Sequence, residues 1–105
     1  MSIFKVYADG EYAVLPWNRY GKEEELHMLQ EHVGGLIEPV RIFSDPDLIA
    51  LVNEEGRLLG LSENKRLPHL VGDVIFVRVE GEDLKPLKAL QVAKLLGLMR
   101  KGGSI

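Results

Sequence analysis

Histidine is the residue type of this chain best suited to acid–base chemistry or metal binding at neutral pH. The chain contains three, His27, His32 and His69. His27 and His32 are five residues apart, which places their rings about 140° apart around a helix, whereas a helical metal pair requires a spacing of three or four. His27 and Glu31 have the spacing of an ordinary helix pair. The histidines therefore predict neither a metal site nor a cofactor.

The other catalytic residue types form no constellation either. The chain contains no cysteine, which excludes thiol catalysis, disulfides and zinc–thiolate sites. Its serines have no patterned His or Asp partner of the kind that a serine nucleophile requires. Gly34 and Gly35 follow a predicted helix, whereas a glycine-rich phosphate loop precedes one. We therefore expect no catalytic residues.

The segment from Trp17 to Tyr20 is the part of the sequence most typical of a binding surface. It holds the only tryptophan of the chain together with Arg19 and Tyr20. Aromatic and arginine side chains are the usual anchors of protein interfaces and of base stacking. In a second interpretation Trp17 instead folds over the neighbouring helix as a lid on the core.

Four further polar residues are candidate binding residues. Glu38 stands on a predicted strand, either as a site carboxylate or as an outward residue of a half-exposed sheet. Asn53 and Glu55 belong to an acidic turn that ends at Gly56, where turn geometry alone explains the asparagine and the glycine. Asn64 is either a residue that bridges its loop or an amide that contacts a ligand.

Length and composition bound the class of protein. The 105 residues are enough for one domain, and 46% hydrophobic with 28% charged residues is typical of a globular chain rather than a disordered one. A net charge of −3 makes nucleic-acid binding an unfavoured function. The sequence has no recognisable signal peptide or membrane-spanning run, so we expect a cytoplasmic protein. The absence of threonine and the many charged residues favour a heat-adapted source.

Hydrophobic periodicity and turn signals predict a single α+β domain over residues 1–105, mainly an antiparallel sheet of about five strands with two main helices. Asp9-Gly10 is a hairpin signal, and Gly34 suits the left-handed residue that closes a helix. Pro39 favours an edge strand or a bulge, whereas the continuous apolar run from Leu48 to Val52 favours a central strand covered on both faces. We expect strands at 3–7, 12–15, 36–43, 48–52 and 74–79. We expect helices at 22–33 and 86–99 and a short helical turn at 62–67. The remaining expected features are a loop at 81–83 and a frayed tail at 102–105.

We expect both helices to pack on one face of the sheet. The predicted core residues are Phe4, Val6, Leu26, Leu29, Val33, Ile42, Leu51, Ile75, Val77 and Leu95. The helix at 86–99 is apolar around much of its circumference, more than one sheet face can cover. This pattern predicts a homodimer through that helix, with an interface that contains Leu90, Leu95, Leu98 and Met99.

Several segments in their order along the chain resemble the family called domain of unknown function 3846. They are the helix end from Leu29 to Gly35, the strand start Ile37-Glu38, the turn from Asn53 to Gly56, Gly60-Leu61 with Asn64, and the segment from Val71 to Ile75. The resemblance covers about residues 3 to 80, and Leu67-Pro68-His69 and the C-terminal helix depart from it. It implies small proteins of bacteria, archaea and their viruses, often encoded near mobile elements, with no established activity or site residue.

These observations favour a non-enzymatic protein that binds another macromolecule, with the segment from Trp17 to Tyr20 as its surface, and that modulates a host or mobile-element process. The alternative is a domain that binds a small ligand or nucleotide, or a weak enzyme. In that case its site would lie near Asn53, Glu55 and Asn64.

Overall fold

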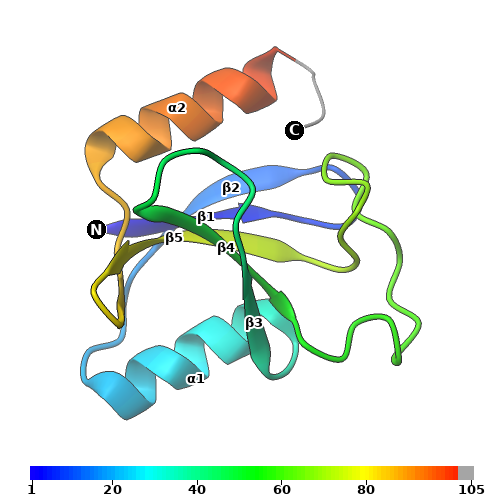
Figure 1. Ribbon diagram of the computed structural model, residues 1–105, viewed down its shortest axis with the longest axis horizontal. Helices are drawn as coiled ribbons and strands as arrows, with labels where there is room; N and C mark the ends of the chain where they lie inside the picture. Colours follow the sequence, from blue (N-terminus) through cyan, green and yellow to red (C-terminus); the bar gives the residue numbers. More distant parts are fainter. Residues whose placement is uncertain (102–105) are drawn as a thin grey trace.

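An antiparallel sheet of six strands lies between two helices, as the computed structural model shows for residues 1–101 (Figure 1). The strand order is β2-β1-β5-β4-β3, and β6 pairs with β5. The α+β domain with an antiparallel sheet is thus confirmed, while the tail at 102–105 lies outside the described residues. The elements are β1 (Ser2–Val6), β2 (Tyr12–Pro16), α1 (Lys22–Val33), β3 (Ile37–Val40), β4 (Leu48–Asn53), β5 (Val74–Glu80), β6 (Asp83–Lys85) and α2 (Ala89–Arg100).

The two helices cover opposite faces of the sheet, so the expectation that both pack on one face is wrong. Side chains alternate along a strand, and β5 sends Val74 and Phe76 toward α2 but Ile75 and Val77 toward α1. All six residues of β4 are buried, as predicted for a central strand. A strand that is apolar on both faces requires a cover on each.

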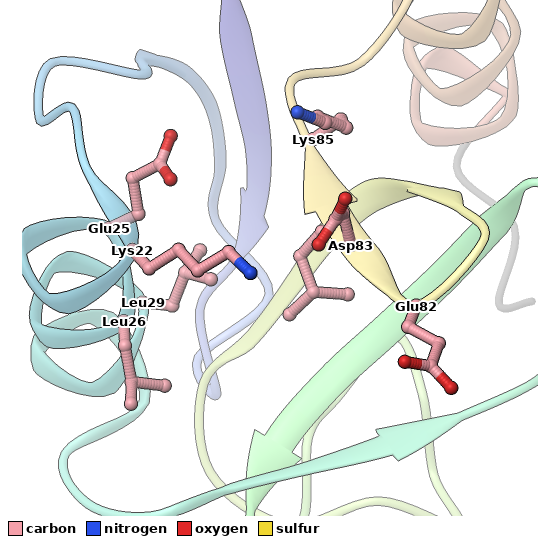
Figure 2. A pocket seen from close by; sticks show the side chains of 8 residues that line it. Lys22, Glu25, Leu26, Leu29, Glu82, Asp83 and Lys85 are labelled. Carbon is pink, nitrogen blue, oxygen red and sulfur yellow. The ribbon is translucent and has the colours of Figure 1, made fainter.

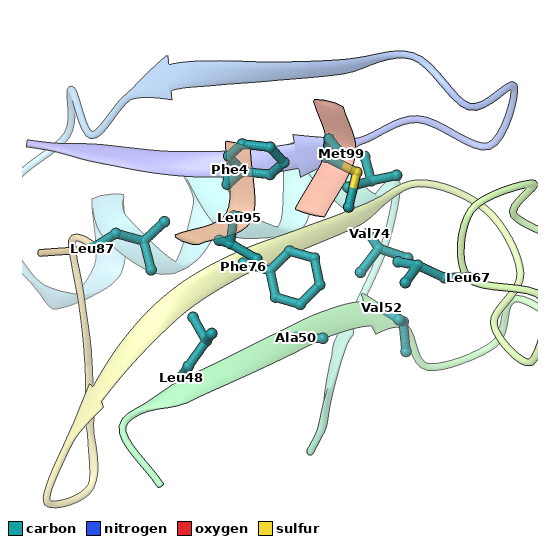
Figure 3. Packing of buried hydrophobic residues seen from close by; sticks show 11 residues of the cluster. Phe4, Leu48, Ala50, Val52, Leu67, Val74, Phe76, Leu87, Leu95 and Met99 are labelled. Atoms are coloured by element: carbon teal, nitrogen blue, oxygen red, sulfur yellow. The ribbon is translucent and has the colours of Figure 1, made fainter. Parts of the chain in front are cut away.

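The core consists of two hydrophobic clusters, one on each side of the sheet. On the α2 side, Leu95 and Met99 pack with Phe4 and Phe76 (Figure 3). On the α1 side, Met28, Leu29 and Val33 pack against the central strands. Leu26, which we predicted to be in the core, is 42% exposed because it lies on the flank of α1 beside the buried stripe. Ile42 is only partly buried at the margin of the α2 cluster.

Helix α1 begins and ends as the sequence predicts. Glu23, Glu24 and Glu25 occupy its first turn, where carboxylates stabilise the positive end of the helix dipole. Gly34 closes it with a left-handed φ of 79°, a conformation that glycine adopts without a steric penalty.

Three local predictions are corrected. Helix α2 begins at Ala89 rather than at Pro86, because the Leu87 N–H donates to the Ser2 carbonyl and keeps that segment extended. The predicted loop at 81–83 is the turn of a hairpin whose second strand is β6. The predicted helical turn at 62–67 is a loop, since its backbone forms a bridge between Glu63 and Val71.

Pro39 protects the β3 edge of the sheet. The Glu54 N–H donates to the Leu36 carbonyl, which fixes the hydrogen-bonded positions of the antiparallel pair. The backbone N–H and C=O groups of Glu38 and Val40 therefore point toward β4. Those of Ile37 and Pro39 point away from the sheet. Proline has no N–H to offer at the outward position, which hinders addition of another strand. The predicted edge position of Pro39 is confirmed.

Candidate functional site

Trp17 is a core residue in the structure, in agreement with the lid interpretation. Only 3% of its surface is exposed, and it packs in the cluster beneath α1. Its indole Nε1–H donates to the Glu25 carboxylate at 3.0 Å. This bond ties the β2–α1 connection to the first turn of α1, and little of Trp17 can contact a partner.

Tyr20 and Arg19 lie on the surface beside Trp17. Tyr20 is 69% exposed, and its hydroxyl donates to the Trp17 carbonyl at 3.4 Å. Arg19 forms an exposed ion pair with Glu24, with 3.4 Å between the Nη1 and Oε2 atoms. Because exposed ion pairs contribute little to stability, Arg19 can leave Glu24 for a partner at small cost. Tyr20 is available to a partner because most of its side chain is exposed.

Tyr20 stands at one end of a surface groove. A hollow of about 340 Å³ is lined by Tyr20 and Trp17 with three basic side chains, Arg78, Lys85 and Lys88. Arg78 is held in place because its Nε–H donates to the Pro86 carbonyl at 3.1 Å.

A second hollow of about 340 Å³ lies between α1 and the β5–β6 hairpin (Figure 2). Glu25 and Lys85 line both hollows. Leu26, Leu29 and Leu84 supply its apolar surface, and charged side chains from α1 and from the β5–β6 hairpin surround them. We refer to the two hollows together as the α1–β6 groove.

Glu38 and Asn53 line a separate, smaller hollow of about 150 Å³ between β3 and the loop that follows β4. Arg57 and His69 line it too, and the Arg57 guanidinium donates to the His69 carbonyl at 2.8 Å. Of the predicted site residues, the structure brings these two together here. Glu55 is exposed in the neighbouring turn and is not among the lining residues.

The buried amide of Asn53 ties the end of α1 to the end of β4. Its Nδ2 donates to the Val33 carbonyl at 3.2 Å, and its Oδ1 accepts from the Glu55 N–H at 2.8 Å. A Cβ atom at Gly35 would lie 2.9 Å from this Nδ2, so only glycine permits the approach. These contacts give Asn53 a structural task.

Asn64 is fully buried and bridges its loop. Its Nδ2 donates to the carbonyls of Val6 and Gly72, at 3.1 and 3.0 Å. Its Oδ1 accepts from the N–H groups of Arg66 and Leu67, at 3.0 and 3.1 Å. Two donors and two acceptors are the full capacity of an amide, so none remains for a ligand.

Lys5, His32 and Asp73 form a polar cluster that the sequence did not reveal. Lys5 is only 9% exposed, and its Nζ lies 3.5 Å from His32 Nδ1 and 3.7 Å from Asp73 Oδ2. The same Nζ lies 4.7 Å from the centre of the Tyr7 ring. The cluster lines a hollow of about 360 Å³, and Gly34 and Gly72 also line it.

The tautomer and charge of His32 follow from its neighbours. An ammonium group can only donate, so Nδ1 accepts from Lys5 and the ring proton lies on Nε2. Burial lowers the pKa of His32 below its ordinary value, and the positive charge of Lys5 lowers it further, against smaller opposing effects of Glu31 and Asp73. At neutral pH the ring is therefore an uncharged donor.

Sequence reasoning missed this cluster because its members come from three distant segments with no common motif. One signal was present: Lys5 occupies the strand position that shares a face with the buried Ile3, where an apolar residue is expected. Within residues 1–101, no group of His, Asp or Glu side chains has an arrangement that could hold a metal ion. No helix in that range is long and apolar enough to span a membrane.

Two of the leucine and methionine side chains predicted for a dimer interface are buried within the domain. Leu95 and Met99 are 0% and 2% exposed because they face the sheet. Leu90 is 84% exposed, and Leu98 is partly buried. The homodimer stays a prediction, and an interface on α2 would have to use Leu90 rather than Leu95 or Met99.

Comparison with known proteins gives one match. A family model described as Domain of unknown function (DUF3846) matches residues 6–100. The matched range includes α2, whereas the resemblance noted in the sequence ended at about residue 80. No curated protein and no solved structure matches the chain.

Proposed function

The chain belongs to the DUF3846 family, and we propose that it is a non-enzymatic module that binds another protein in the α1–β6 groove. The observation that carries this proposal is that the two hollows of the groove adjoin. Two hollows of about 340 Å³ each lie next to one another with Glu25 and Lys85 in the lining of both, and their combined lining extends from Tyr20 to the β5–β6 hairpin. Such an elongated shape fits an extended chain segment better than a compact small molecule.

The surface chemistry of the groove supports a protein partner. An apolar centre with a polar rim is the usual anatomy of a protein interface, and here Leu26 and Leu84 lie among charged side chains. Tyr20 is an exposed aromatic residue at one end, and tyrosine is a frequent interface anchor. Arg78, Lys85 and Lys88 make that end basic, which favours an acidic side chain on the partner.

Affinity purification from the native host tests the proposal, with the tagged wild-type protein compared with the double variant Tyr20→Ala, Lys85→Glu. We expect the wild type to retain a stoichiometric protein at moderate salt and the double variant to lose it. Both changed side chains lie on the groove surface rather than in the core, so the fold should be preserved. Circular dichroism and the melting temperature check that it is.

The matched control is Lys65→Glu, the same charge reversal on an exposed lysine at the other end of β1, where its N–H donates to the Ala8 carbonyl. The control should retain every partner of the wild type. The proposal fails if the double variant keeps all partners, if the control loses them equally, or if the wild type retains none.

A further inference from the structure

The ammonium group of Lys5 is buried 4.7 Å from the centre of the Tyr7 ring, and its contacts with hydrogen-bond acceptors are long. Charge-assisted hydrogen bonds of an ammonium are about 2.7–2.9 Å long. The nearest acceptors of Lys5 lie at 3.5 and 3.7 Å, on His32 and Asp73. Burial of a cation costs desolvation energy that long contacts repay only in part. The ammonium therefore retains capacity for another acceptor in the adjoining hollow of about 360 Å³.

The hollow offers donors and negative charge at the same time. Lys5 supplies an ammonium, and the neutral ring of His32 supplies its Nε2–H. Asp73 and Glu31 line the same hollow, and α1 ends there, which adds the negative end of its dipole. One cation against two carboxylates disfavours a plain anion. The arrangement fits a ligand that carries an anionic and a cationic group together.

The remaining walls are mostly apolar. They come from Ala8, Val33 and Leu61, with Ser62 and two glycines, and a volume of about 360 Å³ is within the range of small-molecule sites. We propose that this hollow binds a free aliphatic α-amino acid, with its carboxylate toward Lys5 and His32 and its ammonium toward Asp73 and Glu31. The site is separate from the α1–β6 groove, so its test is independent of the function proposed above.

Three matched ligands test this inference by ¹H–¹⁵N NMR titration at pH 7: L-valine, N-acetyl-L-valine and L-valinamide. The first carries both charges, the second lacks the ammonium and the third lacks the carboxylate. We expect L-valine to shift the amide signals of Gly34 and Gly72 saturably, because both line the hollow. Each analogue should bind roughly tenfold more weakly, since each loses a charge-assisted contact. The signal of Gly81, in the β5–β6 turn, is the internal reference.

Two variants and one control complete the test. Lys5→Met should fold and lose L-valine binding, whereas Lys65→Met, the same change at an exposed position, should keep it. Glu31→Gln is an exposed change that leaves the core untouched, and it should weaken L-valine but not N-acetyl-L-valine. The inference is overturned if L-valine gives no saturable shift, if all three ligands shift Gly34 and Gly72 alike, or if Lys5→Met binds L-valine as the wild type does.

Discussion

Asn64 and Lys5 are buried polar side chains beside the same strand, β1, and they differ in how well their partners satisfy them. Asn64 makes four hydrogen bonds of 3.0 to 3.1 Å, one of them to the Val6 carbonyl. Lys5 has its nearest acceptors at 3.5 and 3.7 Å. The neutral amide is saturated by short hydrogen bonds within the chain, whereas the buried cation has two long contacts and the face of the Tyr7 ring at 4.7 Å.

This difference separates two reasons for placing a polar group in a protein interior. A saturated network fixes one conformation of the backbone, and Asn64 holds the loop from Ser62 to Gly72 against β1. A buried charge with long contacts contributes little to folding, because its contacts do not repay the cost of removing it from water. Removal of each group should therefore have opposite consequences for stability.

The largest effect is expected for Asn64→Ala. The change leaves the carbonyls of Val6 and Gly72 and two N–H groups without their partner in a fully buried position. We expect the free energy of unfolding to fall by about 3 kcal/mol, measured by urea denaturation. Asn18→Ala, at an exposed asparagine, should change it by less than about 0.5 kcal/mol. Equal losses in the two variants would remove the structural role of Asn64.

Lys5→Met should have a small effect of the opposite sign. Methionine keeps the length of the side chain and removes the cost of a buried charge. The loss of Lys5 as a partner should cost the Asp73 carboxylate little stability, because 34% of its side chain is exposed and its Oδ1 still accepts from the Ala8 N–H. We expect the free energy of unfolding to be unchanged or to rise by about 1 kcal/mol in the same urea experiment. A loss of more than about 2 kcal/mol would place Lys5 with Asn64 as a structural residue.

The sequence predicted local structure better than spatial arrangement. The bounds of α1, its glycine stop and the edge position of Pro39 follow from local chemistry, and the structure confirms them. The apolar run from Leu48 to Val52 indicated a strand covered on both faces, which already conflicted with two helices on one face. Periodicity shows that a helix has an apolar stripe, but it does not show which face of a sheet that stripe covers.

The candidate site was harder to predict for the same reason. Asn53 and Asn64 attracted attention as polar residues near turns, yet their amides are used within the chain. Trp17 suggested an interface anchor, but its hydrogen bond to Glu25 and its burial place it in the core. Lys5, His32 and Asp73 meet only because β1, α1 and the start of β5 converge, which is a property of the tertiary structure.

The smallest expected effect is the pH dependence of stability that His32, the neighbour of Lys5, should cause. His32 has a folded-state pKa below its ordinary value of 6.5, first because of burial and then because of Lys5. Between the folded-state pKa and 6.5, the unfolded chain therefore binds more protons than the folded protein does. The contribution of the neutral ring to stability is lost as the pH falls through that window.

Urea denaturation from pH 7.5 downward should show this loss of stability in the wild type. Much of it should disappear in His32→Gln, which cannot be protonated, and part of it in Lys5→Met, which removes the repelling charge. Since Glu31 and Asp73 also face the ring and favour its protonation, Asp73→Asn should steepen the loss. An identical pH profile in the wild type and in His32→Gln would show that the folded-state pKa of His32 does not lie below its ordinary value.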